Sequence, residues 1–338
     1  MAGQSMRDIK RRIQSVRNTQ QVTKAMEMVS AAKLRRAQAQ VVAARPYANK
    51  IAEVLGRVVE AVHTGDSTIR LEHPLLARRA VRRVLYCAIA ADRGLAGGYN
   101  ANIIRALEAA WAHDRAEGLE VEAVVVGRKL RDYLRRTGRP VRQAYVFIGD
   151  YAHYTKAQEI ARALAEPYVR GEVDRVMLLY SQFVSAAVAR PVTFQLLPVP
   201  EEGPRPWPVG PSGLAAAEPV SRAARQPSAE RSQPAEVAGP GGGRGVERWV
   251  PPYLYHPSAS DVVGAIVERY LDVEVFRALL EAKASEHGAR MTAMRNASDN
   301  AEEMIETLTL SFNRARQASI TKEVIEVTTG KEALAALV

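Results

Sequence analysis

Cysteine is almost missing from this sequence, because Cys87 is the single one among 338 residues. An intramolecular disulfide and a cysteine-based metal cluster are therefore excluded. Cys87 lies within the apolar run 84–89, which favours a buried, inert thiol over a nucleophile. The six histidines are dispersed and form neither a HExxH motif nor an i, i+4 pair. We therefore predict no catalytic residue, no cofactor and no metal site.

Long apolar runs are also missing. The apolar runs that are present, such as 123–127 and 176–180, have the length of a β-strand, whereas a membrane-spanning helix needs about 20 apolar residues. The chain is charged from Arg7 onward and lacks the apolar segment of a signal peptide. We therefore expect an intracellular, soluble protein without a membrane span of its own.

Proline and glycine are absent between Met6 and Arg45, and only Gly288 interrupts 265–329. These lengths predict two unusually long helices, over 6–45 and 258–337. At about 1.5 Å of rise per residue, the second alone would reach on the order of 100 Å. Segments of this length are typical of a rod rather than of core helices.

The ends of these helices carry sequence signals. Ser5 and Ser258 are predicted N-caps, each followed three residues later by an aspartate. Arg45-Pro46 disfavours unbroken helix, although helix is compatible with the sequence again from 47 to about 62.

Apolar residues recur along both predicted helices at the spacing of a coiled coil. The first helix begins this pattern with Ile9, Ile13 and Val16. A stripe this narrow predicts a two-helix seam rather than burial in a broad core, with each helix as the partner of the other. In the second helix the stripe consists of Val262, Ile266, Tyr270, Val273, Leu280, Met294, Ala301, Ile305, Leu308, Phe312, Ala315 and Ser319.

The middle of the chain has a different pattern. Short runs rich in β-branched residues alternate with helical stretches, which predicts a mostly parallel, Rossmann-like α/β sheet with helices on its faces. The last run follows without a helix and fits an antiparallel edge. The predicted strands are 81–90, 121–127, 146–148, 176–180 and 192–197, and the predicted helices are 99–117, 128–137 and 155–170.

Residues 199–252 change character again, because Pro, Gly, Ala, Ser and Arg dominate. This composition buries too little apolar area to offset its ordering entropy, so we expect a flexible insertion. The expected organisation is a coiled-coil helix over 1–62, an α/β domain over 78–198, the insertion over 199–252 and a second coiled-coil helix over 253–338.

The net charge of +10 is unevenly distributed. Residues 1–45 hold ten Lys and Arg against Asp8 and Glu27, whereas 258–338 hold nine against thirteen acidic residues. This basic excess fits nucleic acid, fits acidic loops of a protein partner equally well, and in most proteins is only a solvated helix face. The basic face consists of Arg7, Lys10, Arg11, Arg12, Lys24, Lys33, Arg35 and Arg36.

The loop 92–100 follows a predicted strand and opens a predicted helix, where glycine-rich loops bind phosphate. Its spacing fits neither the dinucleotide fingerprint G-x-G-x-x-G nor a P-loop. A tight structural turn is therefore favoured, and a nucleotide-using enzyme is kept as one hypothesis.

Two stretches of the second helix, 290–300 and 312–323, are rich in amide, hydroxyl and small side chains. Such side chains, together with Arg, suggest hydrogen bonds to other chains. Packing against the helix's own partner explains them as well.

The two ends of the chain resemble a known family, the gamma subunit of the rotary ATP synthase. The resemblance rests on 6–38 (MRDIKRRIQSVRNTQQVTKAMEMVSAAKLRRAQ) and on 286–330 (EHGARMTAMRNASDNAEEMIETLTLSFNRARQASITKEVIEVTTG). The loop 92–100 (DRGLAGGYN) is similar to the family's strand-to-helix turn, where many members have cysteine at the position of Ala96. Only about 199–248 lies outside the resemblance.

The resemblance implies that the terminal helices wind into an antiparallel coiled coil inside a hexameric head of alpha and beta subunits. Rotation of this shaft would couple proton flow to ATP synthesis on beta, so the chain would have no active site of its own. The implied partners also include the epsilon subunit and the membrane c-ring, and the implied location is peripheral, on the cytoplasmic face of the cell membrane. A basic coiled coil that binds nucleic acid is the alternative function.

The resemblance also implies contacts with beta, which the basic face would join by meeting acidic beta loops. One position lies near an acidic loop of beta, three face its catch loop, and two belong to a second helical patch. Met26 is the position near the acidic loop. Arg316, Gln317 and Thr321 face the catch loop, and Arg290 and Asp299 belong to the second helical patch.

One departure from the family concerns regulation. Plant chloroplast members carry an insertion with a cysteine pair that acts as a thiol switch. The insertion here follows the matching segment Leu196-Leu197-Pro198 but holds no cysteine. Redox control by that route is excluded, and we expect a loop with at most a steric or partner-binding role.

Overall fold

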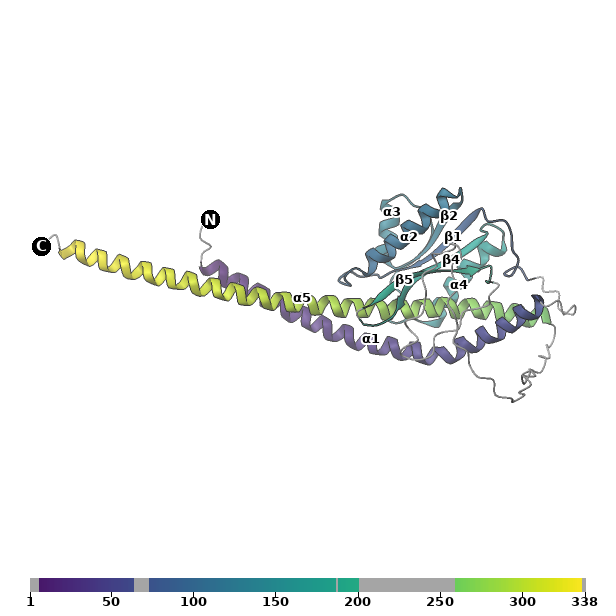
Figure 1. Ribbon diagram of the computed structural model, residues 1–338, viewed down its shortest axis with the longest axis horizontal. Helices are drawn as coiled ribbons and strands as arrows, with labels where there is room; N and C mark the ends of the chain where they lie inside the picture. Colours follow the sequence, from purple (N-terminus) through teal and green to yellow (C-terminus); the bar gives the residue numbers. More distant parts are fainter. Residues whose placement is uncertain (1–5, 64–72, 187, 201–258, 336–338) are drawn as a thin grey trace, which may run out of the picture.

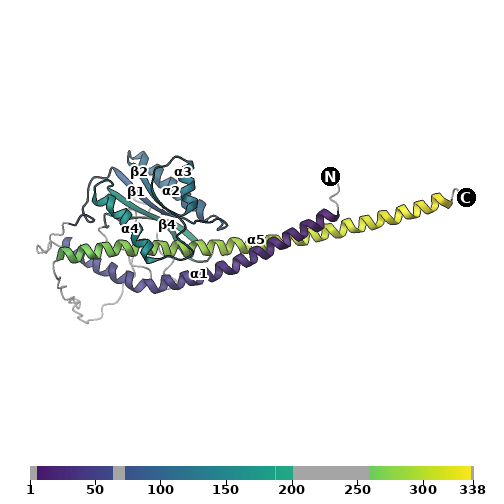
Figure 2. The ribbon, with the colours of Figure 1, turned by 180° about the vertical axis from the view of Figure 1, so that it is seen from behind.

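The computed structural model describes residues 6–63, 73–186, 188–200 and 259–335. It is an elongated rod with an α/β domain on one side, near one end (Figure 1). The rod consists of α1 (Met6–His63) and α5 (Ala259–Ala335), which lie side by side and antiparallel in both views (Figures 1 and 2). The predicted fold class is therefore confirmed. The two predicted N-caps, and the insertion from residue 201 onward, lie outside the described residues.

Helix α1 continues unbroken through Pro46, so the predicted interruption is wrong. Proline removes the N–H that would bond to the carbonyl four residues earlier. On the C-terminal side of Pro46 the same face of α1 stays buried in the core, where Ala48, Ala52 and Leu55 pack. This packing stabilises the helix across the missing hydrogen bond, because tertiary contacts outweigh local preference.

Helix α5 is buried on all sides over 277–288, so the predicted two-helix seam is wrong there. The reason is a second layer, since β4 and α4 cover the side of α5 that faces away from α1. Farther along, 302–319 returns to the predicted pattern. Ile305, Leu308 and Phe312 are half-buried there while the residues between them are exposed.

The α/β domain is built on a five-stranded sheet in the order β3-β2-β1-β4-β5. The first four strands are parallel, and β5 is antiparallel to β4, as the sequence predicts. The strands are β1 (Arg83–Ile89), β2 (Glu120–Val126), β3 (Val141–Tyr145), β4 (Arg175–Phe183) and β5 (Ala189–Leu197). The helices are α2 (Tyr99–Ala116), α3 (Arg128–Arg136) and α4 (Tyr154–Val169).

The third strand lies at Val141–Tyr145, so its predicted position at 146–148 is wrong. Phe147 has a φ of 59°, which an extended strand does not accommodate. Its N–H donates to Oδ1 of Asp92 at 3.0 Å instead of joining the sheet. The apolar character of Ile148 reflects burial of a loop residue in the core, and β3 is a short, partly exposed edge strand.

The sheet separates two apolar cores. Helices α2 and α3 cover one face with Ile103, Leu107 and Leu130 among the buried residues. Helix α4 and the rod cover the other face, which α5 joins through Val275 and Leu279. Cys87 is fully buried in this second core, and burial raises the pKa of its thiol to about 12. The predicted inert thiol is therefore confirmed.

Candidate partner-binding surfaces of the rod

A polar cluster around the loop 149–151 binds the rod to the α/β domain. Nζ of Lys33 lies 2.8 Å from Oδ2 of Asp150, and Arg36 donates to the hydroxyl of Tyr151 at 2.9 Å. From α5, Nε2 of His287 lies 3.1 Å from the carbonyl oxygen of Asp150. The hydrogen bond from Lys33 also lowers the pKa of Asp150. Two members of the predicted basic face, Lys33 and Arg36, therefore bind within the chain.

Arg290 also binds the rod to the α/β domain. Its side chain is only 11% exposed, pairs with Glu286 at 2.9 Å and donates to the carbonyl oxygen of Gly94 at 3.3 Å. The loop 92–100, which contains Gly94, is stabilised by hydrogen bonds to the side chain of Asp92, as expected for a structural turn. Oδ1 of Asp92 accepts the backbone N–H groups of Arg128 at 2.9 Å and of Phe147 at 3.0 Å. The structure thus places Arg290 inside the molecule, apart from the other predicted contact residues.

Polar contacts join the two helices of the rod, and we call the side chains of Thr23, Glu27, Arg295 and Ser298 that form them the register pin. The hydroxyls of Thr23 and Ser298 lie 2.7 Å apart, and both residues are buried. One turn away, the carboxylate of Glu27 binds Lys24 at 3.0 Å and Arg295 at 3.1 Å. Hydrogen bonding, first from Lys24, lowers the pKa of Glu27. The stability from this carboxylate is therefore present at neutral pH and is lost as the pH falls through its lowered pKa.

The register pin predicts a measurable cost for a nearly isosteric change. We expect Thr23→Val to lower the free energy of unfolding by about 1 kcal/mol, because the buried Ser298 hydroxyl loses its cross-helix partner. Thr19→Val is the matched control, since the Thr19 hydroxyl is exposed and bonds only to the carbonyl of its own helix. Urea unfolding followed by circular dichroism measures both. Equal midpoints for the two variants would show that the Thr23–Ser298 contact does not stabilise the rod.

The N-terminal part of α1 presents bases that are available to a partner. Lys10, Arg11, Arg12 and Arg17 are exposed, and none of them has an acidic side chain within 4.0 Å among the described residues. Arg7 and Arg35 are exposed as well, and the side chain of Lys24 stays 59% exposed although it pairs with Glu27. Six of the eight predicted basic-face residues therefore lie on this exposed surface, whereas Lys33 and Arg36 contact the loop 149–151.

The C-terminal part of α5 extends past the N-terminus of α1 as a single helix (Figures 1 and 2). Every residue from 321 to 329 is exposed, including Val327 at 73%. Ile320, Val324 and Ile325 are also more than half exposed. Ile320, Val324 and Val327 follow the i, i+4, i+7 spacing of one helix face, and Ile325 lies about 100° around the helix. A lone helix is marginal in water, and exposed apolar patches typically mark interaction sites. We call 320–329 the tip.

The other predicted contact residues lie at different heights on the rod. Arg316 and Gln317 are exposed just before the tip, and the hydroxyl of Thr321 donates to the Gln317 carbonyl oxygen at 2.9 Å. Met26 is half-buried beside the register pin, and Asp299 is exposed one residue after Ser298. These residues form no single cluster but are spread along the rod, and we call them the track.

Sequence reasoning missed the acceptors that engage part of the basic face. Asp150 and Tyr151 lie far from α1 in the chain, and no local pattern connects them with Lys33 or Arg36. It also missed the apolar tip residues Val324 and Val327, although a signal existed, because they fall outside the predicted stripe.

No helix in the described part of the chain has an apolar segment long enough to cross a bilayer. The family model described as ATP synthase matches residues 5–334. The ATP synthase gamma chain of Heliobacterium modesticaldum is 46% identical over 330 residues, which are 97% of this chain and 99% of that protein. The gamma chain of Moorella thermoacetica is 45% identical over 329 residues, with the same coverage of 97% and 99%.

Solved structures show the same fold at lower identity. The central stalk and c-ring structure of the Tetrahymena thermophila mitochondrial ATP synthase contains a chain with a TM-score of 0.56 and 22% identity. That match covers 82% of this chain and 99% of that chain. The OSCP/F1/c-ring structure of the Euglena gracilis mitochondrial ATP synthase gives a TM-score of 0.59 at 17% identity, covering 98% and 95%.

Proposed function

This chain belongs to the ATP synthase gamma chain family, and from that premise we propose that its helical rod is the shaft that turns inside the alpha and beta subunits. As a gamma chain it is a non-catalytic component of ATP synthase, and the chemistry takes place on beta. The alternative of a nucleic-acid-binding coiled coil is not supported. The observation that carries the shaft proposal is the tip, which leaves the two-helix rod as a single helix with exposed apolar side chains.

The tip needs a sleeve of other chains. Val324 and Val327 lie on one face of the helix and Ile325 lies about 100° around it. All three are more than half exposed, so a flat partner surface that buries the first two would leave part of Ile325 in water. A ring of apolar side chains from the alpha and beta subunits would bury them all. Burial in such a ring favours no particular rotational angle of the shaft, because the hydrophobic effect is nondirectional. It would therefore permit rotation.

Angle-dependent contacts would come from the polar residues. Arg316, Gln317 and Thr321 lie just below and within the tip, where they would meet the beta catch loop. The bases Lys10, Arg11 and Arg12 on α1 would meet acidic beta loops, with Met26 and Asp299 farther along the same track. Exposed ion pairs are worth about 1 kcal/mol or less each, which suits contacts that must be released at every step.

Arg290 is left out of this proposed beta surface. Its guanidinium is engaged by Glu286 and by the Gly94 carbonyl, which supports a role in transmitting torque between the rod and the α/β domain. The α/β domain lies at the opposite end from the tip (Figure 1). We propose that this end contacts the epsilon subunit and the c-ring, and that the complex is peripheral to the cytoplasmic face of the cell membrane.

The contact residues have a direct test in the assembled enzyme. We expect the double variant Arg316→Ala/Gln317→Ala to lower gradient-driven ATP synthesis in vesicles by about three- to tenfold, because two weak contacts of at most about 1 kcal/mol each are lost. The amount of assembled complex should stay unchanged, since neither side chain has a partner within the described part of the chain.

The control removes the same side-chain types elsewhere. Arg115 and Gln143 are exposed on the α/β domain, and Arg115→Ala/Gln143→Ala should leave synthesis normal. Normal synthesis in the Arg316→Ala/Gln317→Ala enzyme would overturn the assignment of the contact residues. Loss of assembly without loss of synthesis per assembled complex would also overturn it.

A further inference from the structure

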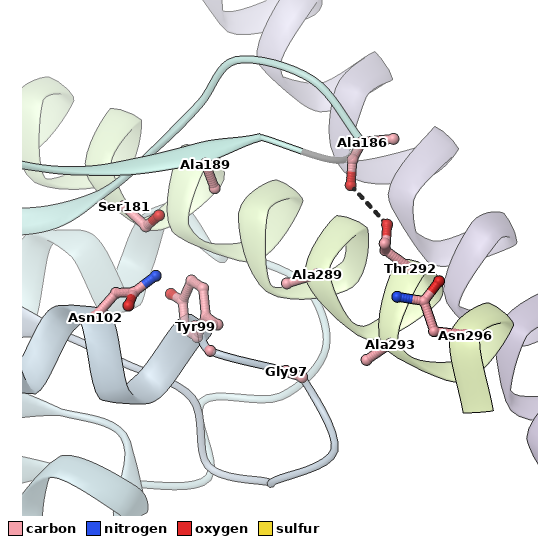
Figure 3. A pocket seen from close by; sticks show the side chains of 12 residues that line it. Gly97, Tyr99, Asn102, Ser181, Ala186, Ala189, Ala289, Thr292, Ala293 and Asn296 are labelled. Atoms are coloured by element: carbon pink, nitrogen blue, oxygen red, sulfur yellow. Dashed lines mark hydrogen bonds between the residues drawn. The ribbon is translucent and has the colours of Figure 1, made fainter. Parts of the chain in front are cut away.

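A pocket of about 280 Å³ lies where the α/β domain meets the rod. It is located at the carboxyl ends of β1 and β4, between the turn that opens α2, the β4–β5 hairpin and α5 (Figure 3). Helix α2 follows β1 onto one face of the sheet, while α4 precedes β4 on the other face. The chain therefore reverses its direction across the sheet between β1 and β4. In open α/β sheets such a switch point is the usual place for a ligand.

One end of this pocket is polar and has no partner. Tyr99 is 5% exposed and Ser181 is 3% exposed, yet neither hydroxyl has a hydrogen-bond partner in the part of the chain that the structure describes. The side-chain amide of Asn102 lies beside them and is also without a partner among those residues. Figure 3 shows these three side chains gathered at one end of the pocket. None of these three polar groups is among the fully buried side-chain atoms that lack a partner, so all can be reached from the pocket and offer hydrogen bonds to a bound molecule.

The remaining wall is apolar and made of small residues. Ala96, Gly97, Ala189, Ala289 and Ala293 line it, and their short side chains leave the space open. At the far end, the hydroxyl of Thr292 already donates to the carbonyl oxygen of Ala186 at 3.2 Å (Figure 3). The amide of Asn296 also lines this far end but is exposed to water, so the Tyr99 end holds the buried groups that still offer hydrogen bonds.

The pocket carries no charge of its own, because none of its twelve lining residues is acidic or basic. A phosphate or a nucleotide would find no cation there. Two hydroxyls and an amide, by contrast, can each donate and accept a hydrogen bond. The chemistry of the pocket thus matches a neutral polar group joined to an apolar body.

We propose that this pocket binds a small neutral molecule that has a primary amide or a hydroxyl at one end and an apolar body. The polar end bonds to Tyr99, Asn102 and Ser181, and the apolar body lies against Ala289 and Ala293. The ligand would touch α2, β4 and α5 at once and would hold the α/β domain on the rod. None of the twelve lining residues is among the proposed contacts with alpha and beta.

Disulfide tethering on the full chain tests the proposal. The native Cys87 is buried and its thiol pKa is raised to about 12, so a cysteine introduced by Ala189→Cys would be the reactive one. The side chain of residue 189 faces the pocket (Figure 3). The probes are three aromatic disulfides of equal length, ending in benzamide, toluene or benzoate. Intact-mass spectrometry under a fixed thiol reductant measures the fraction of chain conjugated with each probe.

We expect the benzamide probe to conjugate about tenfold more than the toluene probe, since the toluene leaves the polar end unpaired. The benzoate probe should conjugate less than the benzamide probe. Adding Tyr99→Phe or Ser181→Ala removes one hydroxyl without changing shape and should reduce the preference for benzamide several-fold. Ala25→Cys, at an exposed position of α1, should show no preference among the probes.

Three outcomes would overturn the proposal. Equal conjugation by the three probes would mean that the pocket holds water only. Preference for benzoate would mean an anion site. A benzamide preference that survives both Tyr99→Phe and Ser181→Ala would mean that the amide binds elsewhere.

Discussion

Gly127→Ala is expected to abolish folding of the α/β domain, at a cost above about 4 kcal/mol. A Cβ at this position would lie 2.3 Å from the carbonyl oxygen and 2.7 Å from the carbonyl carbon of Ala90. These are backbone atoms at the end of the central strand β1, and Ala90 also donates its N–H to the carbonyl oxygen of Val126 at 2.8 Å. The clash therefore cannot be relieved by a side-chain movement. The φ of 102° at Gly127 adds backbone strain for any other residue.

A second glycine provides the control. Gly138 has a φ of 67°, and an added Cβ would meet nothing within 4 Å. Gly138→Ala should therefore cost only the backbone strain, about 1–2 kcal/mol. Trp111 is 1% exposed in the core of the domain, so its fluorescence in urea reports unfolding of this unit once Trp207 and Trp249 are replaced by Phe. If Gly127→Ala unfolded at the same urea concentration as Gly138→Ala, the close approach of β1 to this turn would be refuted.

Arg277→Met should destabilise the junction between the rod and the sheet by about 3–5 kcal/mol near pH 8. The Arg277 guanidinium lies 3.7 Å from Glu274 and 3.2 Å from Glu281, and all three residues are buried. Removing the base leaves two carboxylates without an adequate counter-charge, because burial raises the pKa of Glu281 and the nearby Arg45 of α1 offsets only part of that rise. Arg269→Met is the control, because Arg269 on the same helix is 55% exposed and its pair with Asp272 is weak.

The same cluster predicts a dependence on pH. Burial raises the pKa of Glu274 from its ordinary value of 4.5 to about 7, and Arg277 offsets only part of that rise. The folded chain therefore binds more protons than the unfolded chain between these values, so its stability falls as the pH rises through this window. Glu274→Gln should flatten this fall in urea titrations at pH 4.5, 5.5 and 7. The loss caused by Arg277→Met should likewise be smaller at pH 5 than at pH 8, and a loss independent of pH would contradict the assignment of the cluster.

The sequence was sufficient for the features that depend on local pattern. The absence of Pro and Gly predicts the long helices, and alternating strand and helix signals predict the sheet with its antiparallel edge. The half-burial of Ile305, Leu308 and Phe312 confirms the spacing argument for that part of the rod. Each of these features follows from residues that are neighbours in the chain.

Features that depend on distant segments were predicted poorly. Pro46 was expected to interrupt α1, because its effect on the backbone is local, whereas the packing of Leu55 that overrides it depends on the fold. Residues 277–288 are buried on all sides because β4 and α4 pack against the side of α5 that faces away from α1. Arg290 pairs with Glu286 on its own helix, but its contact with the Gly94 carbonyl likewise joins distant segments, and no local pattern indicates it.

The unequal reach of the two helices has a mechanical consequence. Where α1 and α5 run together, bending one helix requires stretching or compressing the other, so the pair resists deflection. Beyond the stretch that pairs with the described residues of α1, α5 is the more compliant part of the axle. Small misalignments between this chain and its surrounding subunits would be absorbed there as elastic flexing, while the Thr23–Ser298 contact farther down keeps the helices from slipping along each other.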